Sequence, residues 1–155
     1  MGDTGRKIAL LIGVGDYGQG LTSLRCPVNG ANAMREVLLD PEIGGFDEAQ
    51  VLLNPDVGEM QSRISTTFSQ LNKDDLAFLY FTGHGIKAMT GDFYLTTAQS
   101  ELFENKALNA GTAVEAGFVQ KVMKNSYAER KVVILDCCFA SLLHQDSAAP
   151  APHQT

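Results

Sequence analysis

The sequence lacks several features that would place it in a common class of protein. No apolar run approaches the roughly 20 residues that a membrane-spanning helix needs. The opening MGDTGRK leads into a predicted strand without the apolar core of a secretory signal. Only three cysteines are present, two of them adjacent, which is too few for a disulfide framework. The sequence therefore predicts a protein of a reducing, cytoplasmic compartment that makes no membrane contact.

Positive charge is also scarce. The chain has 12 Lys and Arg against 18 Asp and Glu, and a net charge of −6. No basic cluster stands out, and an acidic chain attracts phosphate backbones poorly, so we expect no direct nucleic-acid binding. The 155 residues, 45% of them hydrophobic, are instead enough for one domain with a substantial core.

Apolar patterning predicts strands that alternate with amphipathic helices. Strands are expected at 7–14, 50–54, 76–81, 92–97 and 132–135, and helices at 27–39, 56–72 and 113–125. Asp56 and Glu59 stand in the capping-box relation at the start of the second helix. This order predicts an α/β fold with a mostly parallel sheet and helices on both faces. The Pro- and Ala-rich segment 144–155 is predicted to be a linker or tail after a domain at 1–143.

Two of the predicted strands end in residues that can carry out chemistry. The stretch 131–139 reads KVVILDCCF, and its four apolar residues predict a strand buried on both faces. The stretch 76–85 reads LAFLYFTGHG, an apolar run followed by His84 between two glycines. Because ligand sites in open α/β sheets lie at the carboxyl ends of strands, Cys138 and His84 are expected at one edge. A thiol beside an imidazole is a nucleophile with its activating base.

The loop after the first predicted strand supports a weaker alternative. Residues 13–18 match the letters GxGxxG of a dinucleotide-binding loop. That loop must open a helix directly, whereas here residues 19–22 extend it. A small-molecule-binding domain therefore stays as an alternative.

The GHG triplet and the DCCF box, with His84 lying 54 residues before Cys138, resemble the caspase-like cysteine peptidases. The letters are most similar to metacaspases and bacterial caspase homologues, as are KIALLIGVGDY, SLRCPVNGA and DPEIGGFDEAQVLLNP. The resemblance covers residues 7 to about 143, the large p20-like half of the catalytic domain. It implies a caspase-like three-layer αβα sandwich from which the small p10-like half is absent.

The resemblance also implies roles for individual residues. Cys138 would be the nucleophile and His84 the general base and acid, and the N–H groups of Gly85 and Cys138 would form the oxyanion hole. The glycines beside His84 are expected to let a substrate backbone approach. Asp136 would bind a basic P1 side chain, Arg or Lys, although its alternative role is to cap a following helix. Arg25 lies in a loop comparable to one with which animal caspases hold a P1 Asp.

Three further positions bear on these roles. Gly30 stands where the metacaspases usually carry a second acidic residue, so that carboxylate is missing. Cys137 is expected to point away from Cys138 as a small buried side chain, and Cys26 is expected to pack inside the protein.

The function that the resemblance implies is a cysteine endopeptidase acting on protein or peptide substrates, as an effector of a bacterial signalling or defence system. Its expected partners are a downstream p10-like half or a second chain, and a regulatory protein. The alternative is a catalytically silent or partner-activated interaction module. No cofactor or metal is predicted: Asp74 and Asp75 supply too few oxygens for calcium, and His144 and His153 lack metal-site spacing.

Overall fold

Strands and helices alternate along the chain in the predicted order. The computed structural model describes residues 5–18 and 20–139, so the tail predicted at 144–155 lies outside the described residues. The elements are β1 (Lys7–Gly13), α1 (Cys26–Leu39), β2 (Glu48–Leu53), α2 (Val57–Ser69), β3 (Leu76–Lys87), β4 (Phe93–Thr96), a 3-10 turn (Ala110–Thr112), β5 (Ala113–Glu115), α3 (Ala116–Asn125) and β6 (Arg130–Phe139).

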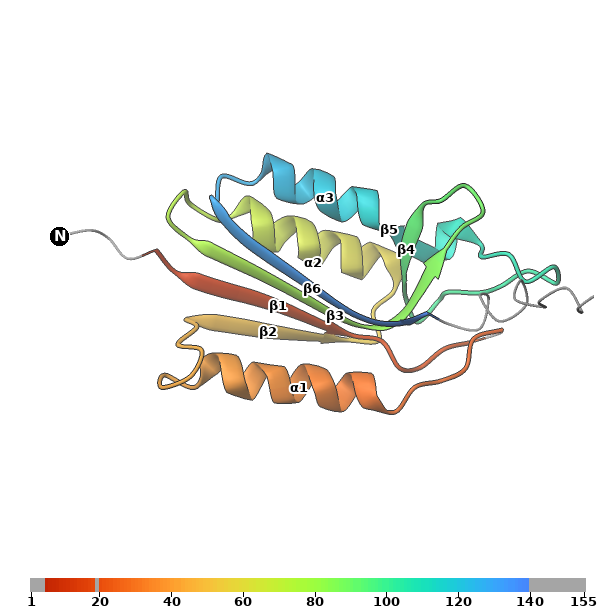
Figure 1. Cartoon of the computed structure of the whole chain (residues 1–155), viewed down its shortest axis with the longest axis horizontal. Coiled ribbons are helices and arrows are strands. Elements are labelled where there is room, and N and C mark those ends of the chain that lie inside the picture. The colour runs from red at the N-terminus through yellow and green to blue at the C-terminus, as the bar shows by residue number, and fades with distance from the viewer. Residues whose placement is uncertain (1–4, 19, 140–155) are drawn as a thin grey trace, which may run out of the picture.

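The strands form one six-stranded sheet (Figure 1). Its order is β2-β1-β3-β4-β5, and β6 also pairs with β3. Strands β1, β2, β3 and β6 are mutually parallel, whereas β4 and β5 form an antiparallel arm. Strand β1 ends opposite Thr82, and β4 takes up the pairing of β3 from Gly85 onward. The prediction of a mostly parallel sheet is confirmed.

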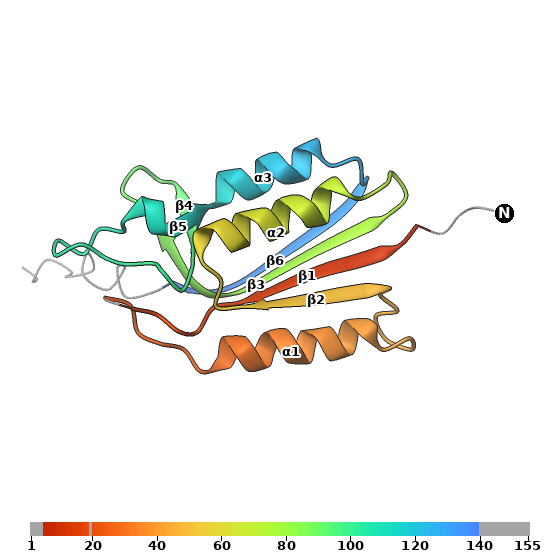
Figure 2. The ribbon, with the colours of Figure 1, turned by 180° about the vertical axis from the view of Figure 1, so that it is seen from behind.

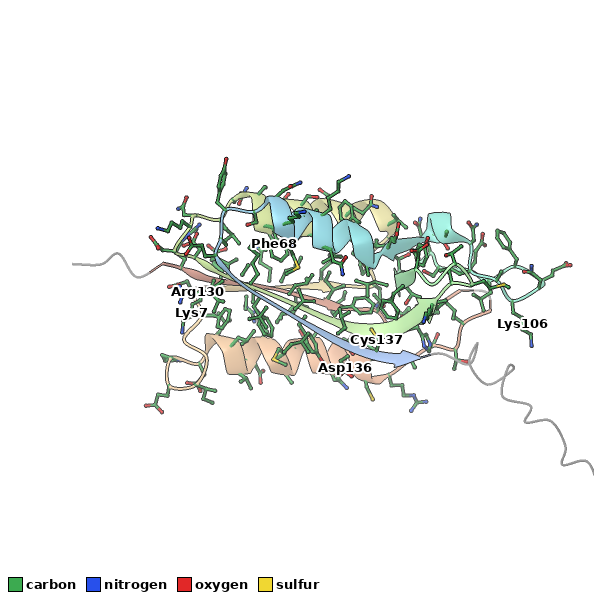
Figure 3. The ribbon with its side chains drawn as sticks, turned by 45° about the horizontal axis from the view of Figure 1, so that its top comes forward. Lys7, Phe68, Lys106, Arg130, Asp136 and Cys137 are labelled. Atoms are coloured by element: carbon green, nitrogen blue, oxygen red, sulfur yellow. The ribbon has the colours of Figure 1, made fainter. Side chains whose placement is uncertain are left out.

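Helices cover both faces of this sheet. Helix α1 lies on one face and α2 with α3 on the other, as two opposite views show (Figures 1 and 2). Leu10 and Ile12 of β1 join the core under α2 and α3, whereas Ala9 and Leu11 join the core under α1. This alternation follows from the two-residue period of a strand. Figure 3 shows Phe68, which is almost completely buried, between the helices and the sheet. The three-layer αβα sandwich is confirmed.

Helix α2 begins as its sequence predicts. The Asp56 carboxylate accepts a hydrogen bond from Glu59 N–H at 2.8 Å, and the Glu59 carboxylate accepts one from Asp56 N–H at 3.2 Å. The predicted apolar face of the helix is buried, with Met60, Ile64 and Phe68 inside the core. The capping box and the amphipathic pattern are therefore both confirmed.

Strand β6 is more exposed than its apolar sequence predicts. Val132, Ile134 and Leu135 expose 41%, 42% and 43% of their surface, so the prediction of a strand buried on both faces is wrong. Helix α1 packs over β1, β2 and β3 instead. In the described part of the chain, β6 pairs with β3 alone. Among the described residues, β6 therefore carries more apolar surface than its position at the edge of the sheet buries.

Two local predictions also fail. Residues 113–115 form strand β5 against β4, and the third helix begins only at Ala116. Cys26, expected to pack inside the protein, is the exposed first residue of α1.

One buried carboxylate ties the start of β1 to the turn before β3. Asp75 is 2% exposed, and its oxygens accept hydrogen bonds from the backbone N–H groups of Arg6 and Asn72, both at 2.8 Å. The Arg6 guanidinium forms a salt bridge with it at 3.4 Å. The Asn72 N–H holds the pKa of Asp75 below its usual value, helped by Arg6 and opposed by burial.

We expect Asp75→Asn to lower the free energy of unfolding at pH 7 by about 1.5–3 kcal/mol, because an amide NH₂ would face one of these donors. A carboxylate whose pKa is lower in the folded state stabilises the fold above the unfolded pKa of about 3.9. That stabilisation is lost as the pH falls through the folded pKa, so wild type and variant should converge in acid. Urea unfolding from pH 7 downward measures this, with exposed Asp74→Asn as the matched control. A wild-type advantage that persists undiminished to about pH 2 would contradict the assignment.

Candidate functional site

His84 lies inside a strand rather than after one. The sequence predicts that β3 ends at Phe81, but the strand continues to Lys87. Pairing with β6 up to Gly85, and with β4 from Gly85 to Lys87, extends it. Strand β1 stops opposite Thr82, so His84 nevertheless lies beyond the carboxyl end of its neighbour, where the topology predicts a site.

The sheet register brings the two predicted catalytic residues together. In the parallel pair of β3 and β6, His84 is the partner of Cys138, and Gly85 is the partner of Phe139. Paired positions on neighbouring strands lie about 5 Å apart. Thr82 pairs with Asp136 two residues back along the two strands. Figure 3 shows Asp136 and Cys137 near the carboxyl end of β6, with Arg130 at its other end.

The imidazole of His84 has one nitrogen engaged and one without a partner. The side chain is buried, and Nε2 lies 2.7 Å from the backbone oxygen of Thr22. A carbonyl oxygen can only accept, so this contact requires a proton on Nε2, and in the neutral ring the lone pair then lies on Nδ1. Nδ1 is buried and has no hydrogen-bond partner among the described residues. Nδ1 is therefore the nitrogen through which a neutral imidazole at this position would accept a proton.

Tyr17 and Thr96 fix the backbone of His84 through a closed set of hydrogen bonds. The N–H of His84 donates to the Tyr17 hydroxyl at 2.9 Å, and the Thr96 hydroxyl donates to the His84 carbonyl at 2.7 Å. Since the Thr96 proton is used there, the Tyr17 hydroxyl donates to Thr96 Oγ1 at 2.7 Å. The Tyr17 ring also lies 4.7 Å from the imidazole centroid. Burial raises the pKa of Tyr17, so it remains a neutral donor.

The two glycines beside His84 make room for the protein's own side chains. A Cβ on Gly83 would lie 2.8 Å from the Tyr17 hydroxyl, and a Cβ on Gly85 would collide with the Phe93 ring. These glycines were expected to admit a substrate backbone, but the contacts explain them through packing. Close approach of Tyr17 to the strand requires a residue without a side chain at 83.

We expect Tyr17→Phe to leave the buried N–H of His84 without an acceptor while keeping the aromatic ring. The free energy of unfolding should fall by about 1–3 kcal/mol, and exchange of the His84 amide proton should accelerate. Amide hydrogen exchange followed by NMR measures both. Tyr127→Phe is the matched control because Tyr127 is 80% exposed. Unchanged His84 protection in Tyr17→Phe would show that the hydroxyl does not hold the strand.

Asn54 holds the loop that carries Tyr17. Its side-chain oxygen accepts hydrogen bonds from the N–H groups of Gly15 at 2.8 Å and Asp16 at 3.0 Å, and its NH₂ donates to the Asp16 carboxylate at 3.1 Å. Asn54 adopts a φ of 48°, a left-handed conformation that asparagine tolerates better than most residues. The turn after β2 therefore shapes the loop after β1.

Asp136 lies within β6 and accepts a hydrogen bond from the Tyr80 hydroxyl at 3.1 Å. Its alternative role as the cap of a following helix is therefore wrong. Asp136 is exposed, whereas Tyr80 is buried, and burial raises the pKa of Tyr80, with the Asp136 bond as a further cause. Arg25 is exposed just before α1 and makes no capping hydrogen bond with its side chain.

Cys137 and Asp136 belong to opposite faces of the sheet. Cys137 is partly buried and packs against the core beneath α2 and α3, whereas the Tyr80 partner of Asp136 belongs to the core beneath α1. The packing of Cys137 agrees with its prediction as a small side chain inside the protein, whereas the side chain of Cys138 lies outside what the structure describes.

Sequence reasoning did not find Tyr17, Thr22, Asn54 or Thr96. Thr22 contributes a backbone carbonyl, which every residue type offers, so no sequence signal marks it. Within the described ranges, no three His, Cys, Asp or Glu side chains converge on a metal-sized site, and no helix combines the length and apolarity needed to cross a membrane.

Comparison with known proteins agrees with this architecture. The crystal structure of protein GSU0716 from Geobacter sulfurreducens is similar, with a TM-score of 0.69 at 16% identity. The match covers 91% of this chain and 53% of that one, so the chain spans about half the length of the solved structure. At this identity the likeness supports the fold alone. No curated protein sequence matches the chain. The family model Peptidase_C14, the caspase domain, matches residues 6–154, and the chain therefore belongs to the caspase-domain family.

Proposed function

We propose that the protein is a cysteine endopeptidase that hydrolyses peptide bonds through Cys138 and His84. The observation that carries this proposal is the sheet register, which pairs Cys138 with a buried histidine whose Nδ1 makes no hydrogen bond among the described residues. A purely structural histidine would be expected to engage both nitrogens, because an unsatisfied buried polar atom is costly.

The contacts of His84 support a two-step acyl-transfer mechanism. Nδ1 takes the thiol proton of Cys138, and the thiolate attacks the peptide carbonyl. The resulting imidazolium keeps its Nε2–H on the Thr22 carbonyl, a hydrogen bond that strengthens with the charge. It then protonates the leaving amine, and His84 next removes a proton from the water that hydrolyses the thioester.

Backbone donors for the developing oxyanion come from the same two strands. We assign this role to the N–H groups of Gly85 and Cys138, which lie one register step apart on β3 and β6. Such donors stabilise the tetrahedral intermediate because they are fixed before the charge develops.

Asp136 gives the proposed enzyme a preference for Arg or Lys at P1. It lies two residues before Cys138 on β6, about 7 Å along the strand, which is within reach of a long basic side chain. Its carboxylate is exposed and therefore available to a substrate. Arg25 is the alternative determinant, and it would select an acidic P1 residue.

The open edge of β6 supports a further partner. Val132, Ile134 and Leu135 are each about two-fifths exposed there, and the chain spans 53% of its solved relative. We assign this edge to a downstream p10-like half or a second chain. By resemblance to bacterial caspase homologues, the protein would act as a cytoplasmic effector in signalling or defence under a regulatory partner.

A second candidate function rests on the same open edge. A catalytically silent caspase-like module would use β6 for protein contact and would need the partner for folding rather than for chemistry.

Reaction of the complete protein with peptidyl acyloxymethyl ketones that carry Arg, Lys or Asp at P1 tests the proposal. Mass spectrometry should locate one adduct, on Cys138, with the Arg or Lys reagent. An adduct formed only with the Asp reagent would indicate that Arg25, rather than Asp136, recognises the P1 side chain. Folded protein that acquires no adduct at Cys138, or reacts equally at exposed Cys26, would favour the silent module.

A further inference from the structure

The Tyr80 hydroxyl is a rigidly held hydrogen-bond donor to the carboxylate of Asp136. Its ring packs in the core with Phe78, Ala31 and Leu38, so the position of the hydroxyl is set by the interior of the protein. From there it donates to Oδ2 of exposed Asp136 at 3.1 Å. An exposed carboxylate would otherwise rotate about its terminal torsion, which has broad preferences.

Helix α1 carries a glycine where it faces this hydroxyl. Gly30 lies within α1, where an alanine would be the better helix former. A Cβ at this position would have the Tyr80 hydroxyl at 3.7 Å and Thr82 Cγ2 at 4.0 Å as its nearest contacts. A longer side chain at 30 would reach the hydroxyl and could compete with Asp136 for its proton. Gly30 therefore preserves the pairing of Tyr80 with Asp136.

We infer that Tyr80 determines specificity by positioning the Asp136 carboxylate. The enzyme then prefers arginine over lysine as the P1 residue of its substrate. The inference rests on the proposed function, because it concerns the same carboxylate. Tyr80 holds the plane of the Asp136 carboxylate fixed through one lone pair of Oδ2, and leaves Oδ1 and the second lone pair of Oδ2 to the substrate.

The chemistry of the two basic side chains explains the selection. A guanidinium is a planar fork whose two parallel N–H bonds require a carboxylate of defined orientation. A lysine ammonium is a compact charge with rotatable donors, so it gains little from a fixed carboxylate plane. Orientation by Tyr80 therefore benefits arginine substrates and leaves lysine substrates nearly unaffected.

Tyr80→Phe tests this inference, because it removes the hydroxyl and keeps the ring in the core. Kinetics of the complete protein are measured with two fluorogenic peptides that differ only in Arg or Lys at P1. We expect the ratio of kcat/KM for Arg over Lys to fall about tenfold, the equivalent of one hydrogen bond to a charged group. The loss should lie in KM for the arginine peptide, with kcat nearly unchanged. Tyr127→Phe, at an exposed tyrosine, serves as the matched control.

Asp136→Asn separates this inference from the proposed function. Loss of cleavage of both basic peptides in Asp136→Asn, with an altered ratio in Tyr80→Phe, supports both. Cleavage after basic residues with an Arg/Lys ratio that Tyr80→Phe leaves unchanged, or that falls through kcat for both peptides, overturns the role of Tyr80 alone. Wild-type protein that cleaves neither peptide and carries no reactive Cys138 overturns the proposed function itself.

Discussion

Cleavage of a peptide with arginine at P1 is expected to disappear in Cys138→Ala and to persist in Cys137→Ala. Cys138 is the register partner of His84, so its removal eliminates the nucleophile and should lower kcat by at least about a thousandfold. Cys137 packs against the core under α2 and α3, on the other face of β6 from the Tyr80–Asp136 pair. Its replacement removes one sulfur from a partly buried position and should affect stability more than turnover.

Steady-state kinetics and thermal unfolding of both variants separate these effects. Cys138→Ala should unfold close to the wild-type temperature and yet be inactive. If Cys137→Ala were the inactive variant, or if both variants retained turnover, Cys138 would not be the nucleophile.

Replacement of His84 by alanine is expected to lower kcat/KM by about 10²- to 10⁴-fold, the usual contribution of a positioned general acid–base. The imidazole alone supplies the Nδ1 lone pair and the Nε2–H contact with Thr22. The hydrogen bonds with Tyr17 and Thr96 use the backbone of His84, so they remain in the variant. The fold of the strand should therefore survive the substitution.

His153→Ala is the matched control, because it removes a histidine that has no role in the proposed chemistry. Rates of both variants with the arginine peptide are compared, together with far-UV circular dichroism. Near-wild-type turnover by a folded His84→Ala variant would exclude this histidine as the base.

The secondary structure was largely predictable because local patterns decide it. The apolar runs of β1 and β3 and the capping box of α2 each carry their signal within a few residues. The extent of β3 was missed because pairing with β4 and β6, far away in sequence, carries the strand past Phe81 to Lys87. The burial of β6 was overestimated because a sequence shows how apolar a strand is, but not which element covers it.

The residues of the candidate site also fall into two groups, those that local sequence predicts and those that depend on distant contacts. His84, Cys138 and Asp136 were found because each is a reactive or charged side chain at the end of an apolar run. Tyr17 and Asn54 were not found, because their roles depend on how two loops fold against each other. The sequence predicts Tyr80 only as part of a buried strand. The role of its hydroxyl depends on Asp136, its hydrogen-bond partner on β6.

The two proposed catalytic residues are anchored very differently. The strand of His84 pairs with β1, β4 and β6 along its length, and Tyr17 and Thr96 fasten its backbone in addition. Within the described residues, the strand of Cys138 pairs with β3 alone. The backbone N–H and C=O groups on its other edge therefore have no strand to pair with there. The base is thus preorganised by this chain, whereas the stiffness of the nucleophile's strand depends on whatever occupies the other side. A partner bound at that edge of β6 would therefore change the rate of the proposed reaction without contacting Cys138 or His84.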